Sequence, residues 1–408
     1  MNQILKFPDG FKWGSATSAH QVEGDNHNDW SEWEKSRPPE FRSGKACDSY
    51  NRYEEDFDIA KSLNQNIHRF SIEWSRIEPK EGIFDHEAMH HYVNVVKALK
   101  ERGIEPMITL WHFTNPVWFA EKGGFLNIDS PTIFTRYVKY VVDNLKDRVG
   151  LWITFNEPWI YAGGSYLKGQ WPPQKHNIFK AIKVRNNIVR SHTLAYQEIK
   201  RVYDVSPKNQ GLYDSTSHNI EPLVGGVENN LHIMSHPVFK GIVKFLDQFV
   251  NLYFWNKTLP YQDFIGLNYY TTVRLPGTRE LRRVDFVSEM NWDVYPKGIY
   301  HRLMELKKYK KPIFITENGV ADSKDERRGK FIKEHLKWVW QAIHDGVDIR
   351  GYLYWSLLDN FEWAYGFRPR FGLVEIDYAT FARKIRPSAF EYAKICRANA
   401  MDISQSRS

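Results

Sequence analysis

Cysteine is almost absent from this chain, which has only Cys47 and Cys396 among 408 residues. Two thiols cannot form the set of disulfide bridges that holds small secreted domains together. We therefore expect a protein of the reducing cytoplasm that is stabilised by a large apolar core.

Long apolar runs are absent as well. No stretch reaches the roughly 18 apolar residues that a membrane-spanning helix requires. The first ten residues, MNQILKFPDG, turn polar after Leu5 and do not form a signal peptide pattern. We expect no membrane contact and no secretion signal.

Linkers, repeats and low-complexity segments are also missing from the sequence. This predicts one domain over residues 1–401, followed by a disordered polar tail, DISQSRS, over residues 402–408.

Acidic residues are slightly outnumbered, with 49 Asp and Glu against 56 Lys and Arg, a net charge of +7. The basic residues are nevertheless spread along the chain, and their densest group, KKYKK at 307–311, is short. A nucleic-acid site would concentrate them on one stripe. The neighbouring His90 and His91 fall in a predicted helix, and no cluster has metal-ligand spacing. We expect no nucleic acid, no metal and no cofactor.

Aromatic residues, by contrast, are abundant, with 15 Trp and 22 Tyr. Leu and Ile fill a core without a polar N–H or O–H that needs a partner. A Trp-rich core is one interpretation. The other is a cleft that stacks on flat apolar faces such as sugar rings, which requires Trp residues at the ends of strands.

Short β-rich apolar runs alternate with amphipathic stretches such as Tyr92, Val95, Val96 and Leu99, whose spacing is helical. Eight parallel strands, apolar on both faces and covered by helices, predict a single (β/α)₈ TIM barrel. In that fold the chemistry lies at the carboxyl ends of the strands. The predicted strands are Phe11 to Ala16, Ile67 to Glu73, Pro106 to Trp111, Leu151 to Phe155, Gln210 to Ser215, Phe264 to Tyr269, Pro312 to Thr316 and Gly351 to Ser356.

Two glutamates follow predicted strands directly. Glu157 lies near the end of WITFNEPW (152–159), and Glu317 lies near the end of PIFITENG (312–319). A single glutamate at a strand end is usually solvated or paired with arginine. Two of them, each beside Asn and a chain-turning Pro or Gly, and without a metal-ligand pattern, indicate acid/base and nucleophilic chemistry on a glycosidic bond.

The other strand ends carry amides, imidazoles, a guanidinium, a phenol hydroxyl, one further carboxylate and indoles. Each has an ordinary explanation alone: Arg69 could neutralise a buried acid, His112 could be a core histidine, and Trp355 could fill the barrel. Their shared position favours a pocket that hydrogen-bonds hydroxyls and stacks on a pyranose. The residues are His20, Gln21, Arg69, His112, Asn268, Tyr270, Trp355, Glu362 and Trp363.

Several long motifs occur in one order: FPDGFKWGSATSAHQVEG, RFSIEWSRI, TFNEP, DFIGLNYYT, ITENG and YWSLLDNFEWAYGF. Together they resemble glycoside hydrolase family 1, the retaining β-glycosidases, from Phe7 to Ala393. The resemblance implies that Glu157 is the general acid/base and Glu317 the nucleophile. It further implies that Asn156 binds the sugar 2-hydroxyl, that Arg69 and Tyr270 hold the nucleophile, that Trp355 is the stacking platform, and that Gln21, His112, Glu362 and Trp363 bind the remaining hydroxyls.

The implied activity is exo-acting hydrolysis of small β-glycosides or short oligosaccharides, with β-glucosides preferred and β-galactosides or β-fucosides as further substrates. Three alternatives stay open: a 6-phospho-β-glycosidase, a silent sugar-binding barrel, and a barrel hydrolase of β-mannan or cellulose chains. Glu362 occupies the place where the phosphate-accepting members carry a Ser- and Lys-containing site. The chain is short for the family between Tyr203 and Asp263, where we expect altered leaving-group preference, and Tyr365 stands at a variable position.

Overall fold

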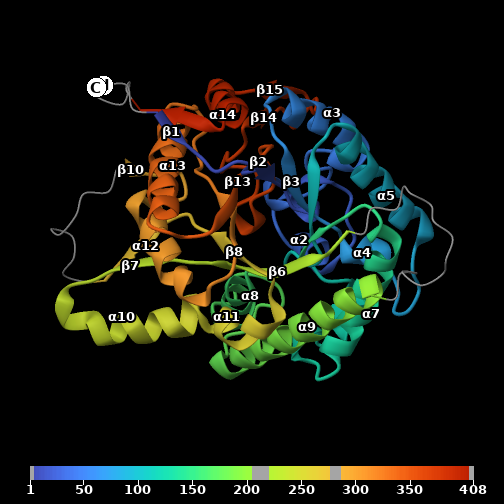
Figure 1. Cartoon of the computed structure of the whole chain (residues 1–408). Coiled ribbons are helices and arrows are strands. Elements are labelled where there is room, and N and C mark those ends of the chain that lie inside the picture. The colour runs from blue at the N-terminus through green and yellow to red at the C-terminus, as the bar shows by residue number, and fades with distance from the viewer. Residues whose placement is uncertain (1–3, 205–219, 276–285, 404–408) are drawn as a thin grey trace.

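The computed structural model describes residues 4–204, 220–275 and 286–403. Its centre is a closed barrel of eight parallel strands in the order β12, β13, β2, β3, β4, β5, β6, β8 (Figure 1). The predicted (β/α)₈ fold is thereby confirmed. The barrel strands are β2 (Lys12–Ala16), β3 (Ile67–Ser71), β4 (Glu105–Thr109), β5 (Leu151–Asn156), β6 (Leu223–Asn229), β8 (Phe264–Asn268), β12 (Ile313–Asn318) and β13 (Ile349–Trp355).

The fifth barrel strand corrects the sequence prediction. We expected it at Gln210 to Ser215, a segment outside the described residues, whereas the barrel is completed by β6. Gly225 and Gly226 weaken the strand pattern of β6 in the sequence. A Cβ atom at Gly225 would lie 2.7 Å from the Phe264 ring, and one at Gly226 would lie 2.3 Å from the Phe254 ring. Neighbouring aromatic rings therefore fill the space that side chains of β6 would occupy.

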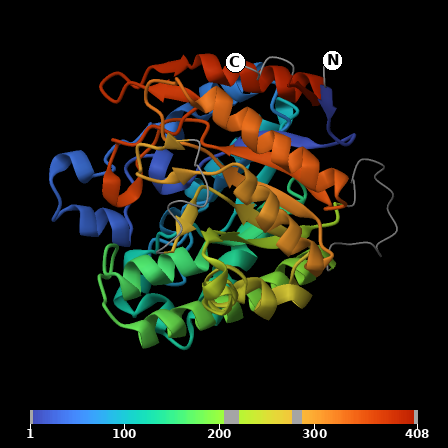
Figure 2. The same cartoon turned by 90° about the vertical axis from the view of Figure 1, so that its left-hand side faces the viewer.

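Helices surround the barrel as an outer layer (Figure 1, Figure 2). Each of the long helices buries an apolar stripe against the strands; on α5 this stripe includes the predicted Tyr92, Val95, Val96 and Leu99. None of the helices in the described ranges has the length and apolar character to cross a membrane. The main helices are α3 (Ser49–Ser62), α5 (His86–Glu101), α7 (Ser130–Leu145), α9 (Ile178–Asp204), α12 (Lys297–Leu306), α13 (Arg328–His344) and α14 (Pro387–Ala398).

The inside of the barrel is filled with apolar side chains. Alternate residues of a strand point inward, and the inward ones form one buried cluster that closes the barrel. Above it, at the carboxyl ends of the strands, the inward residues become polar, so the polar groups gather at one mouth. The cluster consists of Ile67, Met107, Leu151, Ile153, Val227, Phe264, Phe314 and Leu353.

Shorter elements lie in the connections around the barrel. They are α1 (Ala19–Val22), α2 (Asp29–Glu34), η1 (Pro39–Phe41), α4 (Trp74–Ile77), α6 (Val117–Glu121), η2 (Gly124–Leu126), α8 (Pro158–Ala162), η3 (Gly163–Leu167), β7 (His232–Met234), η4 (Pro237–Phe239), α10 (Lys240–Leu246), η5 (Asp247–Asn251), α11 (Tyr253–Thr258), η6 (Leu259–Tyr261), β9 (Thr272–Arg274), β10 (Phe286–Val287), β11 (Asp293–Val294), η7 (Lys307–Tyr309), η8 (Trp363–Tyr365), β14 (Val374–Ile376) and β15 (Arg383–Ile385).

The first and last described strands form a small antiparallel sheet. β1 (Ile4–Lys6) lies beside the last part of the described chain (Figure 1). It pairs with β16 (Ala400–Asp402), with Ile4 opposite Asp402. Asp402 is therefore part of a strand, and the prediction that a disordered tail begins there is wrong at this residue. Residues 404–408 of that tail lie outside the described part of the chain.

Candidate active site

Glu157 follows the last residue of β5, and the chain turns at this residue into α8. Its backbone is left-handed, with φ 47° and ψ 59°, which is unfavourable for a residue with a Cβ atom. Its N–H donates to the Val227 carbonyl at 2.8 Å, and Pro158 opens α8 immediately afterwards. This turn keeps the carboxyl group at the barrel mouth.

Glu317 lies within β12 and is held by two strong donors. Arg69 donates from Nη1 to Oε1 at 2.6 Å, and the Tyr270 hydroxyl donates to Oε2 at 2.5 Å. Arg69 also donates from Nη2 to Asn156 Oδ1 at 2.6 Å. Hydrogen bonds from a cation and a hydroxyl stabilise the ionised carboxylate.

Glu157 has different surroundings. It accepts a hydrogen bond from Asn268 Nδ2 at 2.7 Å and forms no ion pair with any of the described residues. Burial, followed by the charge of Glu317, raises the pKa of Glu157 to about 8. Burial also raises the pKa of Glu317, but Arg69 and Tyr270 oppose that rise. The pair therefore keeps its proton on Glu157 and its negative charge on Glu317.

A cavity of about 630 Å³ opens above this pair. Of the ten residues to which the family resemblance assigns a role, nine line this cavity, and the tenth, Arg69, is buried against Glu317. The structure therefore brings the predicted set together, while their individual roles stay predictions. The lining members are Gln21, His112, Asn156, Glu157, Tyr270, Glu317, Trp355, Glu362 and Trp363.

One side of the cavity is a chain of amide and carboxyl contacts. Gln21 Nε2 donates to the Phe361 carbonyl at 2.9 Å, to Asn360 Oδ1 at 3.0 Å and to Glu362 Oε2 at 3.4 Å. Burial and then the charge of Glu317 raise the pKa of Glu362 to about 8. Gln21 and Glu362 thus present both donors and acceptors to a polyhydroxy ligand.

His112 and Trp355 form a neighbouring side. Burial, and then Arg69, holds the pKa of His112 well below its usual range, so the imidazole is neutral. Its Nε2 lies 3.2 Å from Asn156 Nδ2, and its buried Nδ1 has no hydrogen-bond partner within the described residues. The Trp355 ring is stacked on it at 6.0 Å and 20°. This side offers one imidazole nitrogen and an indole face.

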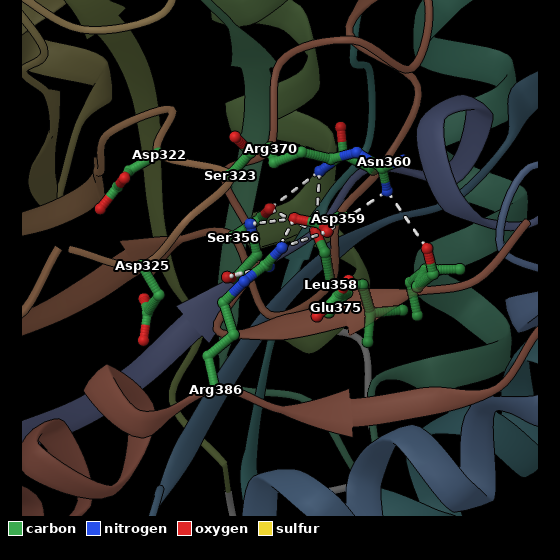
Figure 3. A network of polar contacts seen from close by, with 12 residues as sticks. Asp322, Ser323, Asp325, Ser356, Leu358, Asp359, Asn360, Arg370, Glu375 and Arg386 are labelled. Atoms are coloured by element: carbon green, nitrogen blue, oxygen red, sulfur yellow. Dashed lines mark hydrogen bonds and ion pairs between the residues drawn. The ribbon is translucent and has the colours of Figure 1, made fainter. Parts of the chain in front are cut away.

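The loop after β13, which carries Glu362 and Trp363, is anchored by a buried ionic network (Figure 3). Arg386 donates to both oxygens of Asp359, at 2.8 and 2.9 Å, and both side chains are buried. Asn360 donates to Ser356 Oγ at 2.8 Å. Because Asn360 also accepts from Gln21 of α1, this network connects the loop to the helix that follows the first barrel strand.

The structure differs from the sequence predictions at two strand ends. His20 does not line the cavity: it is buried and bonds to Glu34 Oε1 at 2.8 Å, behind Trp363. Asn268 is more central than its motif indicates, because it bonds both Glu157 and Asn156.

The outer wall of the cavity was not predicted. It is formed by loop side chains, and their spacing in the sequence does not indicate a shared position. Of these residues, only Trp159 could have been predicted to line the cavity, because it lies close to Glu157 in the sequence. Its members include Trp159, Leu167, Lys168, Trp171, Leu231, Val250, Met290 and Trp292, together with Tyr365, whose position we had singled out. Leu231 and Val250 come from the region between Tyr203 and Asp263.

No group of three or more His, Cys, Asp or Glu side chains that could hold a metal ion occurs within residues 4–204, 220–275 and 286–403.

A (β/α)₈ barrel with two buried carboxyl groups and hydroxyl-binding amides at its mouth is the architecture of a glycoside hydrolase. The sequence model of Glycosyl hydrolase family 1 matches residues 3–241 and 256–401. The chain therefore belongs to glycosyl hydrolase family 1.

Individual relatives agree with this membership. The chain is 32% identical to Beta-glucosidase A of Thermotoga maritima over 98% of its own length and 99% of the relative. It is 29% identical to a Beta-galactosidase of Pyrococcus woesei, covering 92% and 94%. Among solved structures, a beta-glycosidase from Pyrococcus horikoshii superposes with a TM-score of 0.88 at 38% identity, covering 98% and 96%.

Proposed function

We propose that this chain is an exo-acting retaining β-glucosidase that also accepts β-galactosides and β-fucosides. The observation that carries the proposal is the unequal pair of carboxyl groups, with the proton on Glu157 and the charge on Glu317. A retaining glycosidase needs this combination of a proton donor and a charged nucleophile.

In the first step, the Glu317 carboxylate attacks the anomeric carbon while Glu157 protonates the leaving oxygen. The bond between the anomeric carbon and the aglycone oxygen breaks, and a glycosyl ester of Glu317 forms. Esterification removes the charge of Glu317, which is one cause of the high pKa of Glu157. Glu157 then ionises more readily and takes a proton from the water that attacks the ester, so the configuration is retained.

In this mechanism Asn156 binds the 2-hydroxyl and Arg69 and Tyr270 hold the nucleophile. Trp355 is the stacking platform, and the other hydroxyls are bound by Gln21, His112, Glu362 and Trp363. The named relatives support a glucoside preference: the Beta-glucosidase of Thermotoga maritima was solved in complex with deoxynojirimycin, and it shares 30% identity and a TM-score of 0.87 with this chain.

Three alternatives are less well supported. A 6-phosphoglycoside needs a cation at the phosphate, whereas the family resemblance places the carboxyl group of Glu362 there, and Glu362 lines this cavity. A silent sugar-binding barrel does not require the ion pair that prepares Glu317. An enzyme that acts on long β-mannan or cellulose chains requires an open groove, whereas the proposed site is a cavity of about 630 Å³. We also propose a cytoplasmic location, since both Cys47 and Cys396 are free and buried thiols.

Replacement of the nucleophile tests the proposal. We expect Glu317→Ala to lower kcat for an aryl β-glucoside on the order of 10⁴-fold or more, because the covalent intermediate no longer forms. Azide should restore turnover and give the α-glycosyl azide. Glu375→Ala, which removes an exposed carboxylate of β14, serves as the control with unchanged activity. Wild-type activity of Glu317→Ala would show that the nucleophile assignment is wrong.

A further inference from the structure

The helix that follows the proposed acid/base starts without a cap of its own. Glu157 is the residue before α8, but its side chain points into the cavity and makes no capping hydrogen bond. Pro158 has no N–H, so the first N–H group that needs an acceptor belongs to Trp159. An acceptor for Trp159 must come from another element.

Glu228, near the end of β6, lies next to this helix start. Val227 belongs to the inward cluster, so Glu228, the next residue, points outward toward the helices. The backbone of Trp159 lies close enough to the Glu228 carboxyl group to lower its pKa, against the stronger effect of burial. In addition, the carbonyl of Val227 accepts the N–H of Glu157. Two consecutive residues of β6 thus lie against the backbone on both sides of Pro158, and Val227 is hydrogen-bonded to it.

The surroundings of Glu228 are unusually dry for a carboxyl group. Glu228 is 1% exposed, and its Oε2 atom has no hydrogen-bond partner within the described residues. Burial, followed by the charge of Glu157, raises its pKa well above the usual range, whereas Arg185 acts in the opposite direction.

The guanidinium of Arg185 contacts aromatic rings and not the carboxyl group of Glu228. Its guanidinium lies over the rings of Tyr253, at 3.6 Å, and Trp159, at 4.9 Å. It makes no ion pair with Glu228 in the described part of the chain. A buried carboxyl group without a salt bridge costs stability, and the N–H group of Trp159 at the start of α8 is the donor that lies next to it.

We propose that Glu228 is a positioning residue that caps α8 across the strand–helix boundary and thereby holds Glu157 in its left-handed backbone conformation, with the carboxyl group aimed at the leaving oxygen. The inference rests on the proposed role of Glu157 as the acid. Glu228 itself does not line the cavity and touches no substrate.

The test compares aryl β-glucosides with good and poor leaving groups, 2,4-dinitrophenyl and phenyl. Proton donation accelerates departure of a poor leaving group and matters little for a good one. We expect Glu228→Leu to lower kcat/KM for the phenyl glucoside about tenfold or more relative to the dinitrophenyl glucoside. Glu228→Gln keeps a carbonyl acceptor for Trp159 and should keep the wild-type ratio.

Gln262→Leu is the matched control. Gln262 is also 1% exposed. Its side chain accepts a hydrogen bond from the N–H of Gly226, which lies on β6 like Glu228, at 3.1 Å. This bond supports β6 and not α8. We expect this variant to lose stability while keeping the wild-type ratio of the two substrates. Circular dichroism on all variants verifies folding, and Glu228→Ser replaces Glu228→Leu if the latter does not fold.

An equal loss for both substrates in Glu228→Leu, or the same change of ratio in Gln262→Leu, would overturn the proposal. Failure of the underlying assignment is distinguishable, because Glu157→Gln would then leave the substrate ratio unchanged as well.

Discussion

At the scale of single residues, the division of charge between Glu157 and Glu317 predicts the pH profile. Glu157 must be protonated to act, and its pKa is about 8, so kcat/KM should decline as the pH rises through that value. In Glu157→Gln we expect the alkaline decline to vanish and kcat/KM for poor leaving groups to fall by about 10² to 10⁴. Initial rates from pH 4 to 10 check this. An unchanged alkaline limb in the variant would assign that limb to another group.

Tyr270 gives a complementary prediction for the acid limb. Its hydroxyl donates to Glu317 and lowers the pKa of that carboxyl. Tyr270→Phe removes the bond without changing the ring, so the pKa of Glu317 should rise. Because Glu317 must be ionised to attack, the acid limb of kcat/KM should move to higher pH. A limb that stays in place, or moves to lower pH, contradicts this role.

At the scale of elements, the loop after β13 depends on the Asp359–Arg386 pair (Figure 3). Removal of Arg386 leaves the buried Asp359 carboxylate with Arg370, at 3.4 Å, as its remaining cation. Because that single long contact does not replace the two short bonds, Arg386→Met should lower the free energy of unfolding by about 3 kcal/mol. Urea denaturation measures this. The exposed pair Arg350–Asp348 provides the control, because Arg350→Met should cost at most about 1 kcal/mol. An equal loss of unfolding free energy in both variants would show that the buried pair contributes no more than the exposed one.

At the scale of the whole molecule, buried carboxyl groups link stability to pH. Glu23 and Asp29 have their pKa raised to about 7 by burial, and Glu157 and Glu362 to about 8. Between their unfolded pKa values, about 4, and these raised folded values, the groups are ionised in the unfolded chain but hold protons when folded. Stability is therefore lost as the pH rises through their folded pKa values.

Histidines oppose this trend only at lower pH. Burial lowers the pKa of His68 and His335 to about 3 and that of His192 to about 4, so these rings are neutral in both states above 6.5. We predict that the free energy of unfolding falls by a few kcal/mol between pH 6.5 and 8, roughly 1.4 kcal/mol per pH unit for each proton retained. Glu362→Gln should flatten the slope. A constant or rising stability over this window would be incompatible with these pKa values.

The sequence predicted the barrel and the inner part of the site because the strands carry apolar runs and deliver polar side chains at their ends. It failed at β6, where Gly225 and Gly226 interrupt the pattern and the rings of Phe264 and Phe254 supply the packing. It also missed the outer cavity wall. Trp171 and Trp292 reach it from loops, and loop conformation depends on contacts that no local periodicity encodes.

The pairing of β1 with β16 has a practical consequence. It joins the two ends of the described chain, and β1 leads into the amino-terminal end of the barrel, whereas the cavity opens at the carboxyl ends of the strands. An anchor or a fusion partner attached at either end would therefore leave the substrate entrance facing solution. Immobilisation on a solid support through a terminal tag should consequently leave KM for a small glucoside unchanged.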